Sequence, residues 1–111
     1  MARLTSDFWV SAYLRQAALD GFDAVLRRRG ASEAGAIFVK LDRLDGTAAL
    51  YGPAPQALVD ESGVRRFQLI LDSDPLSVEE RVERERRFDP DLWLVEIENR
   101  KGDPRLSLAE G

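Results

Sequence analysis

The chain has 111 residues, of which 44% are hydrophobic, and a formal net charge of −4. This length is typical of one domain, and it exceeds the roughly 70–80 residues below which small folds usually need disulfides or metals. Because the chain contains neither cysteine nor histidine, its composition excludes disulfides, Cys/His zinc sites and Ser-His or Cys-His catalytic centres.

Residues 6–20 are predicted to form the first helix. Thr5 or Ser6 can cap its N-terminus, and Gly21 is typical of the position after a helix C-terminus. Apolar residues recur at the three- and four-residue spacing of a helix face, namely Val10, Tyr13, Leu14, Ala17 and Ala18, widened by Phe8, Ala12 and Leu19. A helix this apolar is usually covered on more than one side.

A strand is predicted over residues 22–29, and a loop of small residues over 30–35. Residues 36–51 are predicted to form a hairpin around Asp45-Gly46, a favoured pair for a two-residue turn. Such a turn sets Leu41 opposite Leu50 and Lys40 opposite Tyr51. One face then carries Ile37, Val39, Leu41 and Leu50, and the other carries Phe38, Lys40, Asp42, Ala49 and Tyr51. A longer turn would shift the register and exchange these faces.

The prolines of residues 52–55 are expected to end the second hairpin strand, because proline lacks a ladder donor. Residues 56–64 are predicted to be a polar connection. A further strand is predicted over 65–71, with Phe67, Leu69 and Leu71 on one side.

The second helix is predicted to begin with Ser77 as the N-cap of a capping box, Ser-Val-Glu-Glu. Glu80–Arg84 and Glu83–Arg87 have the spacing of helical ion pairs. Pro90 is expected to end this helix, with Phe88 packing its end into the core. The apolar residues 92–97 then predict a last strand in a central position.

The predicted order is helix, strand, strand, strand, strand, helix, strand. It favours an α+β fold with one layer of mostly antiparallel sheet, about five strands, and two helices on one face of that sheet. We expect a single domain over 1–111, ordered over about 4–100, with a loosely held tail from 101 to 111.

Three segments of the chain, TSDFWVSAYLRQ, AIFVKLDRLDGTAALYGP and ERERRFDPDLWLVEIENR, resemble a known family. It consists of short, mainly alphaproteobacterial proteins catalogued as a domain of unknown function. The resemblance covers about Leu4 to Arg100. It implies a small bacterial domain that occurs as a stand-alone protein, and it transfers no catalytic or binding residue.

Two carboxylate pairs are candidate sites for a hard cation or for acid–base chemistry. They are Asp72 with Asp74, and Asp89 with Asp91, each beside a proline. Turns and helix ends use the same residues, and no phosphate-binding glycine motif accompanies them. We therefore favour a structural role for all four.

Basic residues on or near the predicted strands are the second candidate site. They are Arg27, Arg28, Arg29, Lys40, Arg43, Arg65 and Arg66, interleaved with Phe38, Tyr51 and Phe67. Basic and stacking side chains on one sheet can bind single-stranded RNA. The negative net charge argues against nucleic acid, and arginines on a solvent face commonly pair with nearby acids.

The first helix and the mixed hairpin face leave more apolar surface than one sheet covers. We therefore expect a non-enzymatic interaction module that forms a homodimer or binds a protein partner. The candidate surface is Trp9, Tyr13, Lys40, Tyr51, Arg65 and Arg66. The alternatives are a small RNA- or anion-binding domain and a carboxylate-dependent metal enzyme. No cofactor is expected. No signal peptide or membrane span is visible, which favours the cytoplasm.

Overall fold

The computed structural model describes residues 5–55 and 64–109, which form the two helices and five strands in the predicted order. The α+β class and the mostly antiparallel five-stranded sheet are confirmed. The predicted connection 56–64 lies outside the described residues, apart from Val64. The elements are α1 (Ser6–Leu19), β1 (Asp23–Arg28), β2 (Ile37–Asp42), β3 (Ala48–Pro53), β4 (Phe67–Ser73), α2 (Pro75–Phe88) and β5 (Trp93–Glu98).

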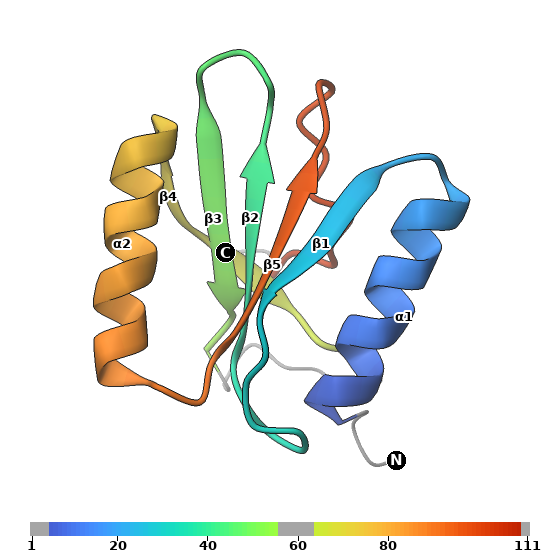
Figure 1. The fold of residues 1–111 in the computed structure, drawn as a ribbon, viewed down its shortest axis with the longest axis vertical. Coiled ribbons are helices and arrows are strands. Elements are labelled where there is room, and N and C mark those ends of the chain that lie inside the picture. Colours follow the sequence, from blue (N-terminus) through green and yellow to red (C-terminus); the bar gives the residue numbers. More distant parts are fainter. Residues whose placement is uncertain (1–4, 56–63, 110–111) are drawn as a thin grey trace.

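The strands lie in the order β1-β5-β2-β3-β4 (Figure 1). β5 pairs with β2 in parallel, and the other neighbours are antiparallel. The last strand is therefore central, as its unbroken apolar run predicts. β1 and β4 form the two edges of the sheet, so the three strands β5, β2 and β3 separate the residues of β1 from those of β4.

The hairpin between β2 and β3 has a three-residue turn, not the predicted two-residue turn. The Arg43 amide donates to the Thr47 carbonyl at 3.2 Å and closes a turn of residues 44–46. Leu44 and Gly46 both have positive φ, of 60° and 86°. Asp42 and Asp45 stabilise the turn, because their carboxylates accept the Leu44 and Thr47 amides.

The longer turn shifts the register by one residue. Leu41 pairs with Ala49, Lys40 with Leu50, and Val39 with Tyr51. The predicted β3 faces are therefore wrong, because side chains alternate along a strand and a one-residue slip exchanges them.

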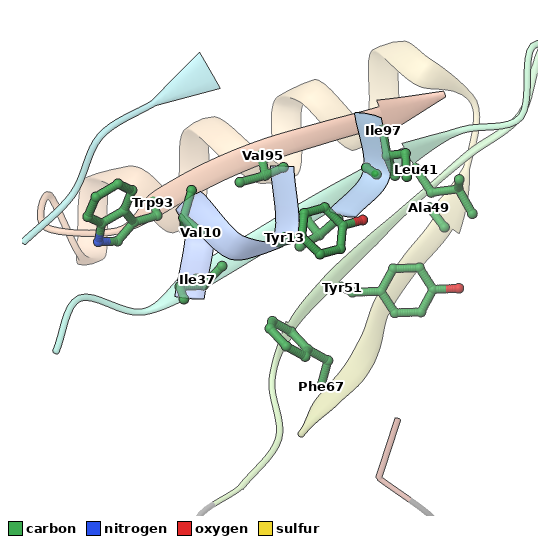
Figure 2. Packing of buried hydrophobic residues seen from close by; sticks show 12 residues of the cluster. Val10, Tyr13, Ile37, Leu41, Ala49, Tyr51, Phe67, Trp93, Val95 and Ile97 are labelled. Atoms are coloured by element: carbon green, nitrogen blue, oxygen red, sulfur yellow. The ribbon is translucent and has the colours of Figure 1, made fainter. Parts of the chain in front are cut away.

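The two helices pack on opposite faces of the sheet. Val10, Tyr13 and Ala17 of α1 join the core that contains Ile37, Val39, Leu41, Ala49, Tyr51, Phe67, Trp93, Val95 and Ile97 (Figure 2). Val78 and Val82 of α2 pack instead with Phe38, Ala48, Leu50, Leu92 and Leu94. The prediction that both helices cover one face is wrong. The central strands are apolar on both faces, so each face requires its own cover.

The helix α1 begins as predicted, with Thr5 as its N-cap. The Thr5 hydroxyl accepts the Phe8 amide at 3.2 Å, and the buried Ser6 hydroxyl donates to the Gly35 carbonyl at 2.6 Å. The bond from Ser6 holds the helix start against the loop that precedes β2.

The helix α2 begins earlier than the predicted N-cap at Ser77. Asp74 is the N-cap, and its carboxylate accepts the Ser77 amide at 3.0 Å. Pro75 occupies the first turn, where a missing amide hydrogen is tolerated. Phe88 is 84% exposed, so its predicted packing into the core is wrong.

The ion pairs on α2 join residues other than the predicted ones. Arg81 contacts Glu85 at 2.9 Å, and Arg86 contacts Glu83 at 2.8 Å.

Within the described residues, no helix combines the length and the apolar character that a bilayer crossing requires.

Two local features of β3 and β4 also differ from expectation. β3 continues through Pro53, because its ladder with β2 has already ended at Tyr51 and no donor is lost there. A bulge in the β3–β4 ladder turns Leu71 toward the α2 side, whereas Phe67 packs with the α1 side. The prediction that these two β4 residues share a face is therefore wrong.

The segment after β5 packs beside α1 and β4. The Tyr13 hydroxyl donates to the Pro104 carbonyl at 2.7 Å, and Leu108 forms a parallel bridge with Phe67. Burial raises the pKa of the Tyr13 hydroxyl, so that group remains a donor at physiological pH.

Candidate functional site

The outer side of α1 carries an exposed apolar stripe. Phe8 is 61% exposed and Leu19 is 71% exposed. Ala12 and Arg15 lie between them at the four- and three-residue spacing that keeps side chains on one side of a helix. We call Phe8, Ala12, Arg15 and Leu19 the outer stripe. It points away from the sheet because Val10, Tyr13 and Ala17 occupy the inner side.

The aromatic side chains Trp9 and Tyr13 of α1 pack against each other, and Trp9 also packs against β4. Trp9 stacks on Tyr13 with ring centroids 5.1 Å apart, and it also lies 5.2 Å from Phe67. These contacts fix the roll of the helix on the sheet. The outer stripe therefore has a defined direction relative to the core.

A cluster of four charged residues lies on the other face, between α2 and the sheet. Lys40 of β2 is only 5% exposed, and its Nζ donates to Glu79 Oε1 at 2.6 Å. Arg27 Nη1 contacts Glu79 at 2.5 Å and Glu96 at 2.9 Å. We call Arg27, Lys40, Glu79 and Glu96 the ionic cluster. It ties α2 to β1, β2 and β5, next to the small apolar anchor of Val78 and Val82.

The ionic cluster holds Glu79 in its charged form. The hydrogen bond from Arg27 is the main cause, and the bond from Lys40 adds to it against the opposing effect of burial. Together they lower the pKa of Glu79 to about 2, from an ordinary value of 4.5. Charge-assisted hydrogen bonds of this kind favour the ionised carboxylate.

This lowered pKa predicts a loss of stability in acid. The contribution of Glu79 is complete above pH 4.5 and disappears as the pH falls toward about 2. Because about a third of the Glu79 side chain is exposed, solvent screening reduces its size, and we expect a loss of about 2 kcal/mol. Urea unfolding of the wild type and of Glu79→Gln across this range measures it. A difference between the two proteins that stays constant with pH would contradict the prediction.

The structure does not bring the six residues of the predicted interaction surface together. Tyr13, Lys40 and Tyr51 are buried. Lys40 lies on the α2 side of the sheet, whereas Tyr51 lies on the α1 side. The exposed positions expected for these three are corrected, because Tyr13 lies on the inner side of α1 and the two helices cover both faces of the strands that carry Lys40 and Tyr51.

The other three residues of that surface are half-buried on the α1 side and just before β4. Trp9 is half-buried on the flank of α1, and Arg65 and Arg66 are half-buried just before β4. A common surface that includes all six residues is therefore not present in the described part of the chain.

The basic residues are spread over both edges of the sheet. Arg27 and Arg28 lie on β1, and Arg65 and Arg66 precede β4, the opposite edge. Arg43 makes two hydrogen bonds to Asp72, at 2.7 and 3.0 Å. Within residues 5–55 and 64–109, the basic residues of β1, β2 and the hairpin thus mostly contact acids in place of forming one patch.

Arg29 illustrates this pairing. Its guanidinium contacts Asp7 at 3.3 Å and lies 5.2 Å from the ring centroid of Trp93. Arg29 therefore links Asp7, at the start of α1, to the core residue Trp93.

Three of the four candidate carboxylates make structural contacts. Asp72 pairs with Arg43, and Asp74 caps α2. The hydrogen bond from the Ser77 hydroxyl is the main reason that the pKa of Asp74 is lowered to about 2. Asp89 accepts the Asp91 amide at 3.1 Å. In the part of the chain that the structure describes, no three Asp or Glu residues gather in a way that could hold a metal ion.

The sequence predicts neither the outer stripe nor the ionic cluster. Phe8, Ala12 and Leu19 are predicted from the sequence as a widening of the buried face, although their spacing sets them on the opposite side of the helix from Val10. Glu79 lies inside the predicted capping box, but the capping carboxylate of that motif is Glu80, so the predicted motif gives Glu79 no role of its own. The signal for the ionic cluster was a lysine inside the apolar run Ile-Phe-Val-Lys-Leu, since a buried lysine requires an acidic partner.

Comparison with known proteins now identifies the family. The family model described as "Protein of unknown function (DUF1491)" matches residues 4–107. The chain belongs to this family. The resemblance drawn from its three sequence segments is confirmed.

Solved structures agree with the fold. A crystal structure of a DUF1491 family protein from Caulobacter crescentus is 34% identical, with a TM-score of 0.79 over 96% of this chain and 98% of that one. A solution structure of an A. tumefaciens protein is 40% identical, with a TM-score of 0.83 over 98% and 97% of the two chains. An NMR structure of a C. crescentus family protein is 34% identical, with a TM-score of 0.79 over 99% and 100%. The comparison with curated proteins gives no match.

Proposed function

We propose that the protein is a non-enzymatic interaction module that forms a homodimer through the outer stripe of α1. The observation that carries this proposal is the exposure of Phe8 and Leu19, 61% and 71%, on one line of a helix whose inner side is already packed. Large apolar side chains aligned on a surface commonly mark an association site.

The spacing of the outer stripe suits a second copy of the same helix. In an antiparallel pair with its two-fold axis between Ala12 and Arg15, Phe8 of one copy lies against Leu19 of the other. The same symmetry repeats that contact on the far side of the axis. Ala12 at the centre is small and allows the two helices to approach closely.

The apolar area of the outer stripe supports a weak dimer. Burying one Phe or Leu side chain contributes about 1.5–3 kcal/mol, and each copy offers two such side chains. Association costs at least about 4 kcal/mol in lost freedom of motion. We therefore expect a dissociation constant of roughly 10 µM or higher.

Light scattering or sedimentation equilibrium tests the dimer. Between roughly 10 µM and roughly 500 µM protein, the average mass of the wild type is expected to rise toward that of a dimer. Phe8→Glu and Leu19→Glu should each remain monomeric, because they would bury a charge at the contact. Both residues are exposed, so thermal stability should change little.

Leu76→Glu is the matched control, because Leu76 is 68% exposed on α2 and lies outside the outer stripe. This variant should associate like the wild type. A wild-type protein that stays monomeric over the whole concentration range would contradict the proposal. Dimerisation that survives both α1 substitutions would also contradict it.

The two alternatives have less support. An RNA-binding sheet requires a shared basic surface, whereas Arg27 and Arg65 lie at opposite edges of the sheet, and Arg27, Arg29 and Arg43 contact acids. A carboxylate-dependent metal enzyme requires converging acids, which the described residues do not supply. As part of the proposal we assign the protein to the cytoplasm, because a chain free of cysteine suits a reducing compartment.

A further inference from the structure

A groove of about 250 Å³ lies between the end of β1 and the side of α2 that faces the sheet. Val82 of α2 and Leu94 of β5 line it, and both are nearly fully buried. β1 and β5 are neighbours in the sheet (Figure 1), so this lining spans an edge strand and a central strand. The groove lies on the opposite face of the sheet from α1.

The charges around the groove are nearly balanced. Arg27 contacts Glu79, and Arg86 contacts Glu83, so both glutamates that line the groove are occupied by arginines that also line it. These pairs leave no carboxylate of the groove for its third arginine, Arg28.

Arg28 has an unmet need for an acceptor. Its Nη2 donates to the Pro90 carbonyl at 2.7 Å, which is a neutral group. Its Nε is shielded from solvent and has no hydrogen-bond partner. Among the described residues, Arg28 is the one basic side chain of the groove that makes no ion pair. A guanidinium in this situation favours an anionic acceptor, because a shielded donor without a partner is costly.

We propose that this groove binds a monocarboxylate with an apolar body, and that the Arg28 guanidinium holds the carboxylate. Three arginines and two glutamates line the groove, so one positive charge remains for one negative charge. The neighbouring Glu79 and Glu83 would repel the second charge of a phosphate dianion. Val82 and Leu94 suit an aliphatic chain beside the carboxylate. The site is independent of the proposed dimer, because α1 contributes no residue to it.

The ligand chemistry has two possible sources, a small aliphatic acid or the C-terminal carboxylate of a peptide. Titration of ¹⁵N-labelled protein followed by NMR uses four probes: butyrate, N-acetyl-Ala-Ala, the amide of that dipeptide, and inorganic phosphate. Butyrate is expected to cause saturable shifts at Arg28, Val82 and Leu94, with a dissociation constant of roughly 1–10 mM. The dipeptide amide should cause none, because it lacks the carboxylate.

Arg28→Lys keeps the positive charge and removes the planar fork, so the fold should persist, as the dispersion of its NMR spectrum would verify. Its affinity for butyrate is expected to fall at least about tenfold. Arg84→Lys, on the exposed side of α2, should bind like the wild type.

Three results would overturn the proposal: no saturable shift with butyrate, equal affinity in Arg28→Lys, or phosphate binding at this groove as tightly as butyrate. If the dipeptide binds about tenfold more tightly than butyrate, the source is a peptide C-terminus. If the two bind equally, the source is a small acid. Both of these results support the site.

Discussion

Replacing Glu79 with glutamine is expected to lower the free energy of unfolding by about 2 kcal/mol at neutral pH, because glutamine, like the protonated acid, carries no charge. Glu79 is the acceptor at 2.6 Å for the nearly buried Lys40 ammonium, whose remaining acid, Glu96, is 3.9 Å away. Removing the carboxylate leaves a shielded positive charge with poor compensation. Breaking one side of a buried pair costs more than removing the whole pair.

A double substitution separates this effect from a loss of packing. In Lys40→Met with Glu79→Gln, the buried charge is gone, and Arg27 keeps its contact with Glu96 at 2.9 Å. We expect this protein to be more stable than Glu79→Gln alone. Urea unfolding of Lys40→Met, of Glu79→Gln and of the double variant gives the coupling energy between the two residues.

Glu80→Gln is the matched control, because Glu80 is an exposed neighbour on the same helix. Its stability should lie within about 0.5 kcal/mol of the wild type. A Glu79→Gln protein as stable as this control would show that the ionic cluster does not hold α2 on the sheet.

Gly30→Ala is expected to lower the free energy of unfolding by about 3 kcal/mol, since overpacking without room to relax is destabilising. A Cβ at Gly30 would overlap the Asp91 carbonyl oxygen and would lie 2.6 Å from the Leu92 carbonyl carbon. Both are backbone atoms just before β5. The Ala31 amide also donates to the Asp91 carbonyl at 2.9 Å, so the two segments cannot separate without breaking this bond.

The loop from Gly30 to Gly35 is tied to the core as well as to β5. The Trp93 indole donates to the Ala31 carbonyl at 2.8 Å, and the Ser6 hydroxyl donates to the Gly35 carbonyl. A displaced loop would therefore disturb the start of α1 and the largest core side chain together.

Gly21→Ala is the comparison variant for Gly30→Ala. A Cβ there meets no atom within 4 Å, but the backbone φ is +84°. The cost should be limited to backbone strain, about 1 kcal/mol. Thermal and urea unfolding should rank Gly30→Ala as clearly less stable than Gly21→Ala. The reverse order would contradict the close approach of the two backbones.

Local sequence signals predicted the elements well because each depends on neighbouring residues. Thr5 and Gly21 bound the first helix, and the apolar run after Pro90 became the central strand β5. The Asp45-Gly46 pair located the hairpin turn, although not its length. Turn residues, caps and periodicity act over a few residues, which is why the order of the helices and strands could be predicted.

The candidate sites were harder to predict because they depend on contacts between distant segments. Lys40 and Glu79 are 39 positions apart, yet they form one ion pair. Arg43 and Asp72 are 29 positions apart, and they meet because the order of the sheet brings β4 next to the β2–β3 hairpin. The predicted surface patches are wrong where the fold places residues that are close in the sequence, or of the same type, on different faces or edges of the sheet.

The sequence by itself determined the composition limits, the order of the elements and the family, since these depend on residue identity and local pattern. The tertiary structure alone decided the face of each β3 side chain, the side of the sheet that α2 covers, and the exposure of Phe8 and Leu19. The physical reason is that one residue more in the hairpin turn exchanges the two faces of a strand. Similarly, a strand that is apolar on both sides does not specify which helix covers which face until the chain has folded around it.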